Sequence, residues 1–285
     1  MQSNNPVFRN AEGFNGQRTY AGNGQAHAGF GQPGYDQQGY SDPSTWGTGT
    51  PTHQGDQGRM TIDSVVQKSA IALFVVVATA VATWIFIGDV TASDAAIARL
   101  SMAAGGGALA AFALSMVNSF KKVVSPALVL LFCVAEGVAL GGLSKFFDAR
   151  FGDGIITQAV LGTFAAFVGT LAAYKVFNIK VSAKFNRFLM AAVVGMIALS
   201  VMEFGLSFFG AQVGFFGFTT LGLIFAVIGL VLGVLMLISD FDMIENGVRN
   251  GLPERESWRA AFALTVALVW IYTNLLRILA ILRGD

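Results

Sequence analysis

The chain has 285 residues, of which 54% are hydrophobic and 12% charged, and its formal net charge is +1. A soluble domain usually has about twice that charged fraction, and a nearly neutral chain without a basic stripe has no electrostatic basis for binding nucleic acid. The two histidines, His27 and His53, lie in the polar N-terminal part, so the apolar part has none for a catalytic triad or a zinc site, and we expect neither an enzyme nor a metal or organic cofactor.

Residues 1–60 form a Gly/Gln/Asn-rich segment in which aromatic residues are spaced singly. The segment has no helical or strand periodicity and too little apolar mass to offset the entropy of an ordered chain. We therefore expect a disordered tail that acts as a tether. Single aromatic residues in a polar low-complexity segment also leave self-association open.

Seven apolar runs follow, each about as long as the ~20 residues that an α-helix needs to cross the hydrocarbon layer. We expect them at 69–87, 98–117, 124–143, 155–177, 188–209, 215–239 and 260–282. Continuous runs satisfy their backbone hydrogen bonds as helices, whereas the strands of a membrane β-barrel are short and alternate. The expected fold is therefore all-α, a seven-transmembrane-helix bundle over residues 61–285. Six spans with a re-entrant last segment is the alternative, because Asn274 and Arg277 make the last run less apolar.

Two of the runs contain further packing signals. Pro126 falls in the first turn of the third run, where proline is tolerated. The sequence AAGGGALAA in the second run is rich in small residues, which favour close packing between membrane helices.

Lysine and arginine flank the runs unequally. One side has eleven such residues: Arg59, Lys68, Lys121, Lys122, Lys175, Lys180, Lys184, Arg187, Arg249, Arg255 and Arg259. The other side has four: Arg99, Lys145, Arg150 and Arg283. Because cytoplasmic flanks carry the excess of cations, we expect the N-terminus and its tail in the cytoplasm and the C-terminus outside.

Four ionisable residues interrupt the otherwise apolar runs: Glu136, Glu203, Asp240 and Arg277. A charge at this depth is costly unless it faces protein or water, so these four are the candidates for an ion path or a gate. Counting about 1.5 Å per residue places Glu136, Glu203 and Arg277 in the outer half of the membrane, where they could pair. The alternative is that Arg277 extends to the outer headgroups and Glu136 is protonated.

Asp240 lies near the inner end of the sixth run. Gly229, Gly233 and Met236 precede it at helical spacing and share its face. Small residues on that face let a neighbouring helix approach closely. We therefore expect Asp240 to face the centre of the bundle.

Other polar residues lie near these candidates. Asp242 and Glu245 share a different face close to the membrane surface, where a solvated helix end is the simplest interpretation. On the last run, Ala267, Asn274 and Arg277 share one face. We expect Asn274 to form an interhelical hydrogen bond, with a ligand role as the alternative.

These residues also carry a family resemblance. The stretch SDFDMIENGVRNGLPERESWRAAFALTVALVWIYTNLLRILAIL resembles the end of Bax-inhibitor-like proteins, the transmembrane Bax-inhibitor motif family, and EGVALGGLS is similar to the acidic EG..LG segment of that family. The opening SNNPVFRN resembles its actinobacterial branch. The resemblance covers about residues 60–285. It implies a bacterial plasma-membrane protein with seven helices, the last of them near the centre.

The resemblance also implies a function. Some family members are described as pH-sensitive calcium leak channels, in which an aspartate on the sixth helix and one on the seventh share a proton and close the pore. Asp240 matches the first aspartate, but the second position is Ala267, so the implied pH gating is weakened. A single carboxylate is also a poor calcium site, although Glu136, Glu203 and backbone carbonyls could contribute along a path.

We therefore expect a passive cation leak channel, with calcium as the permeant ion. The alternative is a non-transporting regulator that binds another membrane protein, such as a protease, and the missing aspartate favours this alternative. Secondary transport would require paired interrupted helices, and no clear internal repeat is visible. Apart from the lipid bilayer, the sequence specifies neither a partner nor an oligomeric state.

Overall fold

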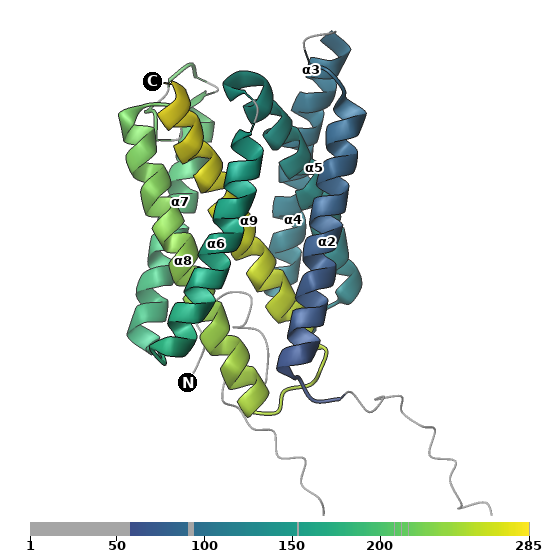
Figure 1. The fold of residues 1–285 in the computed structure, drawn as a ribbon, viewed down its shortest axis with the longest axis vertical. Helices are drawn as coiled ribbons and strands as arrows, with labels where there is room; N and C mark the ends of the chain where they lie inside the picture. Colours follow the sequence, from purple (N-terminus) through teal and green to yellow (C-terminus); the bar gives the residue numbers. More distant parts are fainter. Residues whose placement is uncertain are drawn as a thin grey trace, which may run out of the picture.

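The computed structural model describes residues 58–90, 94–152, 154–207, 209–211, 213–215 and 217–284. Within these ranges the chain is helical except for loops and one isolated antiparallel bridge between Arg59 and Pro253. Seven helical spans are long and apolar enough to cross a membrane (Figure 1). This confirms the predicted all-α, polytopic fold class. Residues 1–57 of the predicted disordered tail lie outside the described residues.

The spans follow one another in chain order. They are α2 (Ile62–Ile87); α3 (Asp94–Ser101) with the π-helical turn η3 (Met102–Gly106) and α4 (Gly107–Phe120); α5 (Pro126–Phe151); α6 (Ile155–Val176); α7 (Ala183–Ser207); α8 (Thr220–Arg249); and α9 (Glu256–Gly284). Pro126 is in the first turn of α5, as predicted. The last span is one continuous helix, so the re-entrant alternative is wrong.

Several helices begin or end away from the limits of their apolar runs. α2 begins at Ile62, before the predicted residue 69, because Thr61 and Ser64 form a reciprocal capping box that satisfies free amides of the first turn. α8 begins at Thr220 instead of residue 215, because the Thr219 hydroxyl caps the amide of Gly222. Hydropathy marks the part of a helix inside the lipid, whereas caps mark its ends.

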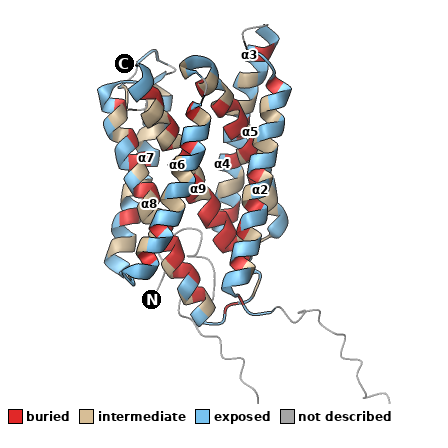
Figure 2. Cartoon of the chain, viewed as in Figure 1, coloured by how far each residue is buried: buried red, intermediate tan, exposed pale blue. Residues whose placement is uncertain are grey.

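The last helix lies at the centre of the bundle. α9 packs against α2, α5, α6 and α8, and it crosses obliquely between them in Figure 1. In its most apolar stretch 56% is buried, against 11% in α7, and Figure 2 shows the buried residues concentrated along α9 and α5. The central position implied for the last helix is therefore confirmed, and α7 is peripheral.

Small residues bring α5 close to both of its main neighbours. A Cβ on Gly137 would lie 2.5 Å from the Val76 carbonyl oxygen of α2, and one on Gly107 of α4 would lie 2.6 Å from the amide nitrogen of Ala139. Because lipid provides little hydrophobic force between helices, such close backbone contact is a main source of their association. The predicted close packing of the AAGGGALAA run is confirmed at Gly107.

A tight turn joins α8 to α9 at the end of the bundle where α2 begins. Gly251 has φ +66°, a conformation that favours glycine, and the amide of Leu252 donates to the Gly247 carbonyl in the manner of a Schellman cap. The following residues pair with the segment before α2, because the Met60 amide donates to the Leu252 carbonyl at 2.7 Å. We call this end the tail end, and the opposite end the C-terminal end.

Candidate functional site

Asp240 is the most buried of the predicted site acids. The residue is 2% exposed, and its carboxylate oxygen Oδ2 is buried with no hydrogen-bond partner among the described residues. Its neighbours on α8, Leu237 and Phe241, belong to an apolar cluster shared with α9. The predicted inward orientation of Asp240 is confirmed. An isolated charge in such surroundings is costly unless a proton, a cation or water compensates it, which makes this carboxylate the first candidate for ion or proton exchange.

Glycines close the seam between α8 and α9 on the Asp240 face. A Cβ on Gly233 would lie 2.6 Å from Cγ1 of Ile271, and one on Gly229 would overlap the side-chain amide of Asn274. Trp270 donates from Nε1 to the Gly229 carbonyl at 2.8 Å. The predicted close approach along this face is therefore confirmed. The antiparallel contacts leave Asp240 at the tail-end half of a tightly packed seam.

Ala267 stands where the family resemblance places a second aspartate. Gly229 contacts Asn274 and Gly233 contacts Ile271, so counting on along the two antiparallel helices places Asp240 near Ala263 and Leu264. Both are about one turn from Ala267, which is fully buried. Thus α9 offers an apolar methyl group where a second carboxylate would stand. Within the described residues, no group of three or more His, Cys, Asp or Glu side chains could hold a metal ion.

Glu136 lies on a different seam. It is half-buried on α5, next to Gly137, which touches α2. No hydrogen bond or ion pair of its carboxylate is present among the described residues. Glu136 falls in the first half of α5, which extends to Phe151, and therefore lies toward the tail end of the bundle. Its depth in the membrane stays a prediction.

Arg277 and Glu203 come together at the C-terminal end of the bundle. Arg277 donates from Nη2 to the carbonyls of Phe215 at 3.0 Å and Gly222 at 3.5 Å. Glu203 of α7 accepts from the Gly214 amide at 2.9 Å and is close enough to Arg277 to attract its charge. Of the predicted cluster of Glu136, Glu203 and Arg277, only Glu203 and Arg277 lie together. Both bind the loop before α8.

Asn274 packs against Gly229 without bonding to it. Its Nδ2 donates to the Trp270 carbonyl of its own helix at 2.8 Å, and the interhelical hydrogen bond comes from the Trp270 indole instead. The prediction that Asn274 forms an interhelical hydrogen bond is therefore wrong for the described residues, because its amide bonds within α9 and the neighbouring Trp270 bonds across the seam. Asn274 is 6% exposed, which supports a packing role.

The comparison with known families agrees with this architecture. The Bax inhibitor 1 like family matches residues 5–284. The chain belongs to this family. The match covers all seven spans and extends into the N-terminal tail, further than the resemblance predicted from the sequence. A search of curated proteins finds no match.

In this Bax-inhibitor-like chain, Asp242 and Glu245 bind the α6–α7 connection. Asp242 accepts from the Val181 amide at 3.3 Å, and Glu245 accepts from the Tyr174 hydroxyl at 2.8 Å. Glu245 also pairs with Arg249 one turn later. The exposed Glu245 agrees with a solvated helix end, whereas Asp242 is half-buried. Both also attach α8, to the end of α6 and to the segment before α7.

A second polar network at the tail end was not predicted. Arg259, interpreted as a flanking cation, is 2% exposed; its Nε lies 2.9 Å from Oε2 of Glu256, and its Nη2 donates to the Lys122 carbonyl at 2.8 Å. Lys68 of α2 pairs with Glu254 at 2.7 Å. The spacing of Glu256 and Arg259, three residues apart on one helix, was the available signal.

Proposed function

We propose that this membrane protein is a passive cation leak channel, with calcium as its permeant ion, and that the conformation described here is closed. The observation that carries the proposal is the buried Asp240 carboxylate, whose Oδ2 has no partner among the described residues. A closed seam of glycines and apolar side chains lies beside it. The proposal includes neither an enzymatic step nor a resident cofactor.

Opening would require α9 to move away from α8 near Asp240, so that water and a cation reach the carboxylate. Calcium prefers six to eight oxygen ligands, and one carboxylate with backbone carbonyls offers fewer. Such a site holds the ion weakly, which suits passage more than storage. Because Ala267 supplies no second carboxylate, only the protonation of Asp240 itself can make the flux depend on pH.

Flux into liposomes loaded with a calcium dye tests the proposal. The purified protein should raise calcium entry above that of empty vesicles, and Asp240→Asn should lower it several-fold, because the substitution removes the buried charge that attracts the cation. Asp94→Asn is the matched control, since Asp94 is an exposed acid at the start of α3. Entry equal to that of empty vesicles, together with no effect of Asp240→Asn, would end the channel proposal.

A second candidate function is that of a regulator, which binds another membrane protein such as a protease and transports no ions. The observation that favours it is the fully buried Ala267 at the position of the second carboxylate. A seam that lacks the second carboxylate has no shared proton with which to gate. Under this candidate, calcium entry stays at the level of empty vesicles, and a membrane protease co-purifies with the chain even after deletion of residues 1–57.

We propose the bacterial plasma membrane as the location, with the tail end in the cytoplasm. The supporting observation is the excess of lysine and arginine on the flanks at that end. A phosphatase fused after residue 284 should be active because it lies outside the cell, whereas a fusion at the N-terminus should be inactive. The opposite pattern would reverse the orientation.

A further inference from the structure

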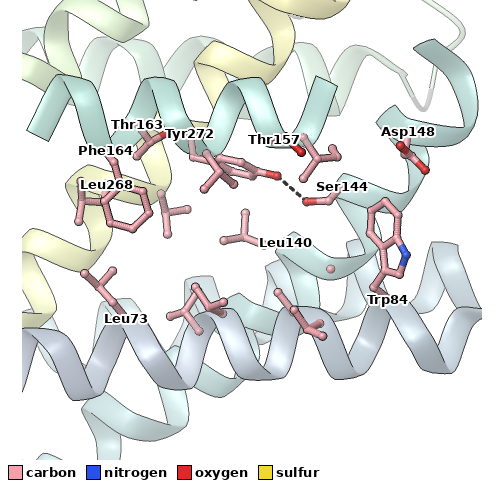
Figure 3. A pocket seen from close by; sticks show the side chains of 18 of the residues that line it. Leu73, Trp84, Leu140, Ser144, Asp148, Thr157, Thr163, Phe164, Leu268 and Tyr272 are labelled. Atoms are coloured by element: carbon pink, nitrogen blue, oxygen red, sulfur yellow. Dashed lines mark hydrogen bonds between the residues drawn. The ribbon is translucent and has the colours of Figure 1, made fainter. Parts of the chain in front are cut away.

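An apolar groove opens on the side of the bundle between α2 and α6. Its volume is about 490 Å³, and its lining comes from α2, α5, α6 and α9. Exposed residues such as Val77 on α2 and Val160 on α6 form its rims. In the floor, Tyr272 and Ser144 share a hydrogen bond of 2.7 Å, as Figure 3 shows. In a membrane the open side faces lipid.

The groove spans one leaflet of a bilayer. Its lining on α2 runs from Leu73 to Trp84, which is about 16 Å at the helical rise per residue. The hydrocarbon core is about 30 Å thick, so the groove covers about half of it. Trp84 lies near the C-terminal end of the bundle, in the last turn of α2. A transmembrane partner helix would require a groove through both leaflets, whereas one acyl chain requires only this length.

Polar and charged groups surround the end of the groove that reaches the membrane surface. Asp148 and Thr157 line that end beside Trp84 (Figure 3), and Nζ of Lys145 lies 4.5 Å from the centre of the Trp84 ring. Among the described residues, neither Asp148 nor Lys145 takes part in an ion pair. One cation and one carboxylate, three residues apart on α5, are therefore both available to a headgroup.

We propose that the groove binds one phosphatidylethanolamine molecule from the leaflet at the C-terminal end. One of its two acyl chains lies along the apolar lining, the phosphate contacts Lys145, and the ammonium group contacts Asp148. Phosphatidylglycerol lacks the ammonium group, so its net negative charge faces Asp148 uncompensated. Phosphatidylcholine has a methylated ammonium that cannot donate a hydrogen bond to the carboxylate. The inference does not depend on whether the protein conducts ions.

Native mass spectrometry of the full chain, released from nanodiscs with equal amounts of the three phospholipids, tests the proposal. The wild type should retain one lipid, with phosphatidylethanolamine at least several-fold enriched. Val160→Trp should remove the retained lipid by filling the groove. Val194→Trp is the matched control, because Val194 is an exposed residue of the peripheral α7, and it should retain the lipid. Circular dichroism verifies that both variants keep their helix content.

The headgroup assignment has its own test in the same mixture. Asp148→Asn should reduce the preference for phosphatidylethanolamine over phosphatidylglycerol to near unity, and Lys145→Gln should weaken retention of every phospholipid. Equal retention by Val160→Trp and Val194→Trp would show that the bound lipid does not lie in the groove. Retention of the three phospholipids in proportion to the mixture would overturn the proposed specificity.

Discussion

Replacing Gly233 with alanine tests the tight packing of the α8–α9 seam. The new Cβ would lie 2.6 Å from Cγ1 of Ile271, where ordinary contact begins at 3.4 Å, so α9 must retreat by about 0.8 Å. Ile271 is fully buried and β-branched, which leaves it few rotamers for escape, and Trp270 beside it is held by its bond to Gly229. Overpacking of this kind costs about 1–3 kcal/mol, and the better helix propensity of alanine returns about 0.5–1 kcal/mol, so we expect a net loss of about 1–2 kcal/mol.

Thermal unfolding in detergent, followed by circular dichroism, measures this loss. The control is Gly195→Ala on α7, where nothing lies within 4 Å of the new Cβ, and it should gain about 0.5–1 kcal/mol from helix propensity alone. At roughly 2–4 °C per kcal/mol for a chain of this size, the two variants should melt about 3–12 °C apart. If Gly233→Ala melts at or above Gly195→Ala, the seam is looser than described. If the α8–α9 seam is the ion path, Gly233→Ala should also raise calcium entry into liposomes, because the added methyl group separates the two helices.

Three further predictions concern charged and gating positions. Ala267→Asp places a second carboxylate about one turn from Asp240. Calcium flux should then rise more steeply with pH across neutrality than in the wild type, because the shared proton is lost and the like charges repel. A pH profile unchanged from that of the wild type would contradict the proposed pairing. Arg259→Met removes the nearer cation of the buried Glu256 and leaves only Arg255, whose Nε lies 4.0 Å from Oε1 of Glu256. The variant should cost about 3–5 kcal/mol in a thermal melt, with Arg259→Lys recovering only part of the loss. A stable methionine variant would show that the Arg259–Glu256 pair is dispensable. Lys68→Met should cost about 1–2 kcal/mol, because it removes a partly buried, charge-assisted hydrogen bond to Glu254. Arg249→Met removes only the exposed pair with Glu245 and should be nearly neutral. Equal melting temperatures of the two variants would refute this ranking.

Much of the fold follows from local sequence. A run of about 20 apolar residues forces a helix in lipid, since no other regular structure satisfies its backbone, and all seven runs became spans. The spacing of Gly229, Gly233 and Asp240 was enough to predict that the carboxylate points inward, because helical periodicity determines which residues share a face. The ends of the helices were harder to predict from the sequence, since capping residues such as Thr61 and Thr219 lie outside the apolar cores of the runs.

The partners of the charged residues were decided by tertiary structure alone. Glu203 and Arg277 come together because both bind the loop before α8. Glu136 lies apart from them, in the first half of α5. The burial of Arg259 and the groove between α2 and α6 likewise depend on how the helices are rotated and set in register. A single sequence determines which segments enter the membrane, because that depends on the transfer of each segment from water to lipid. Which side chains then meet depends on contacts among segments far apart in the chain, and only the packed bundle contains that information.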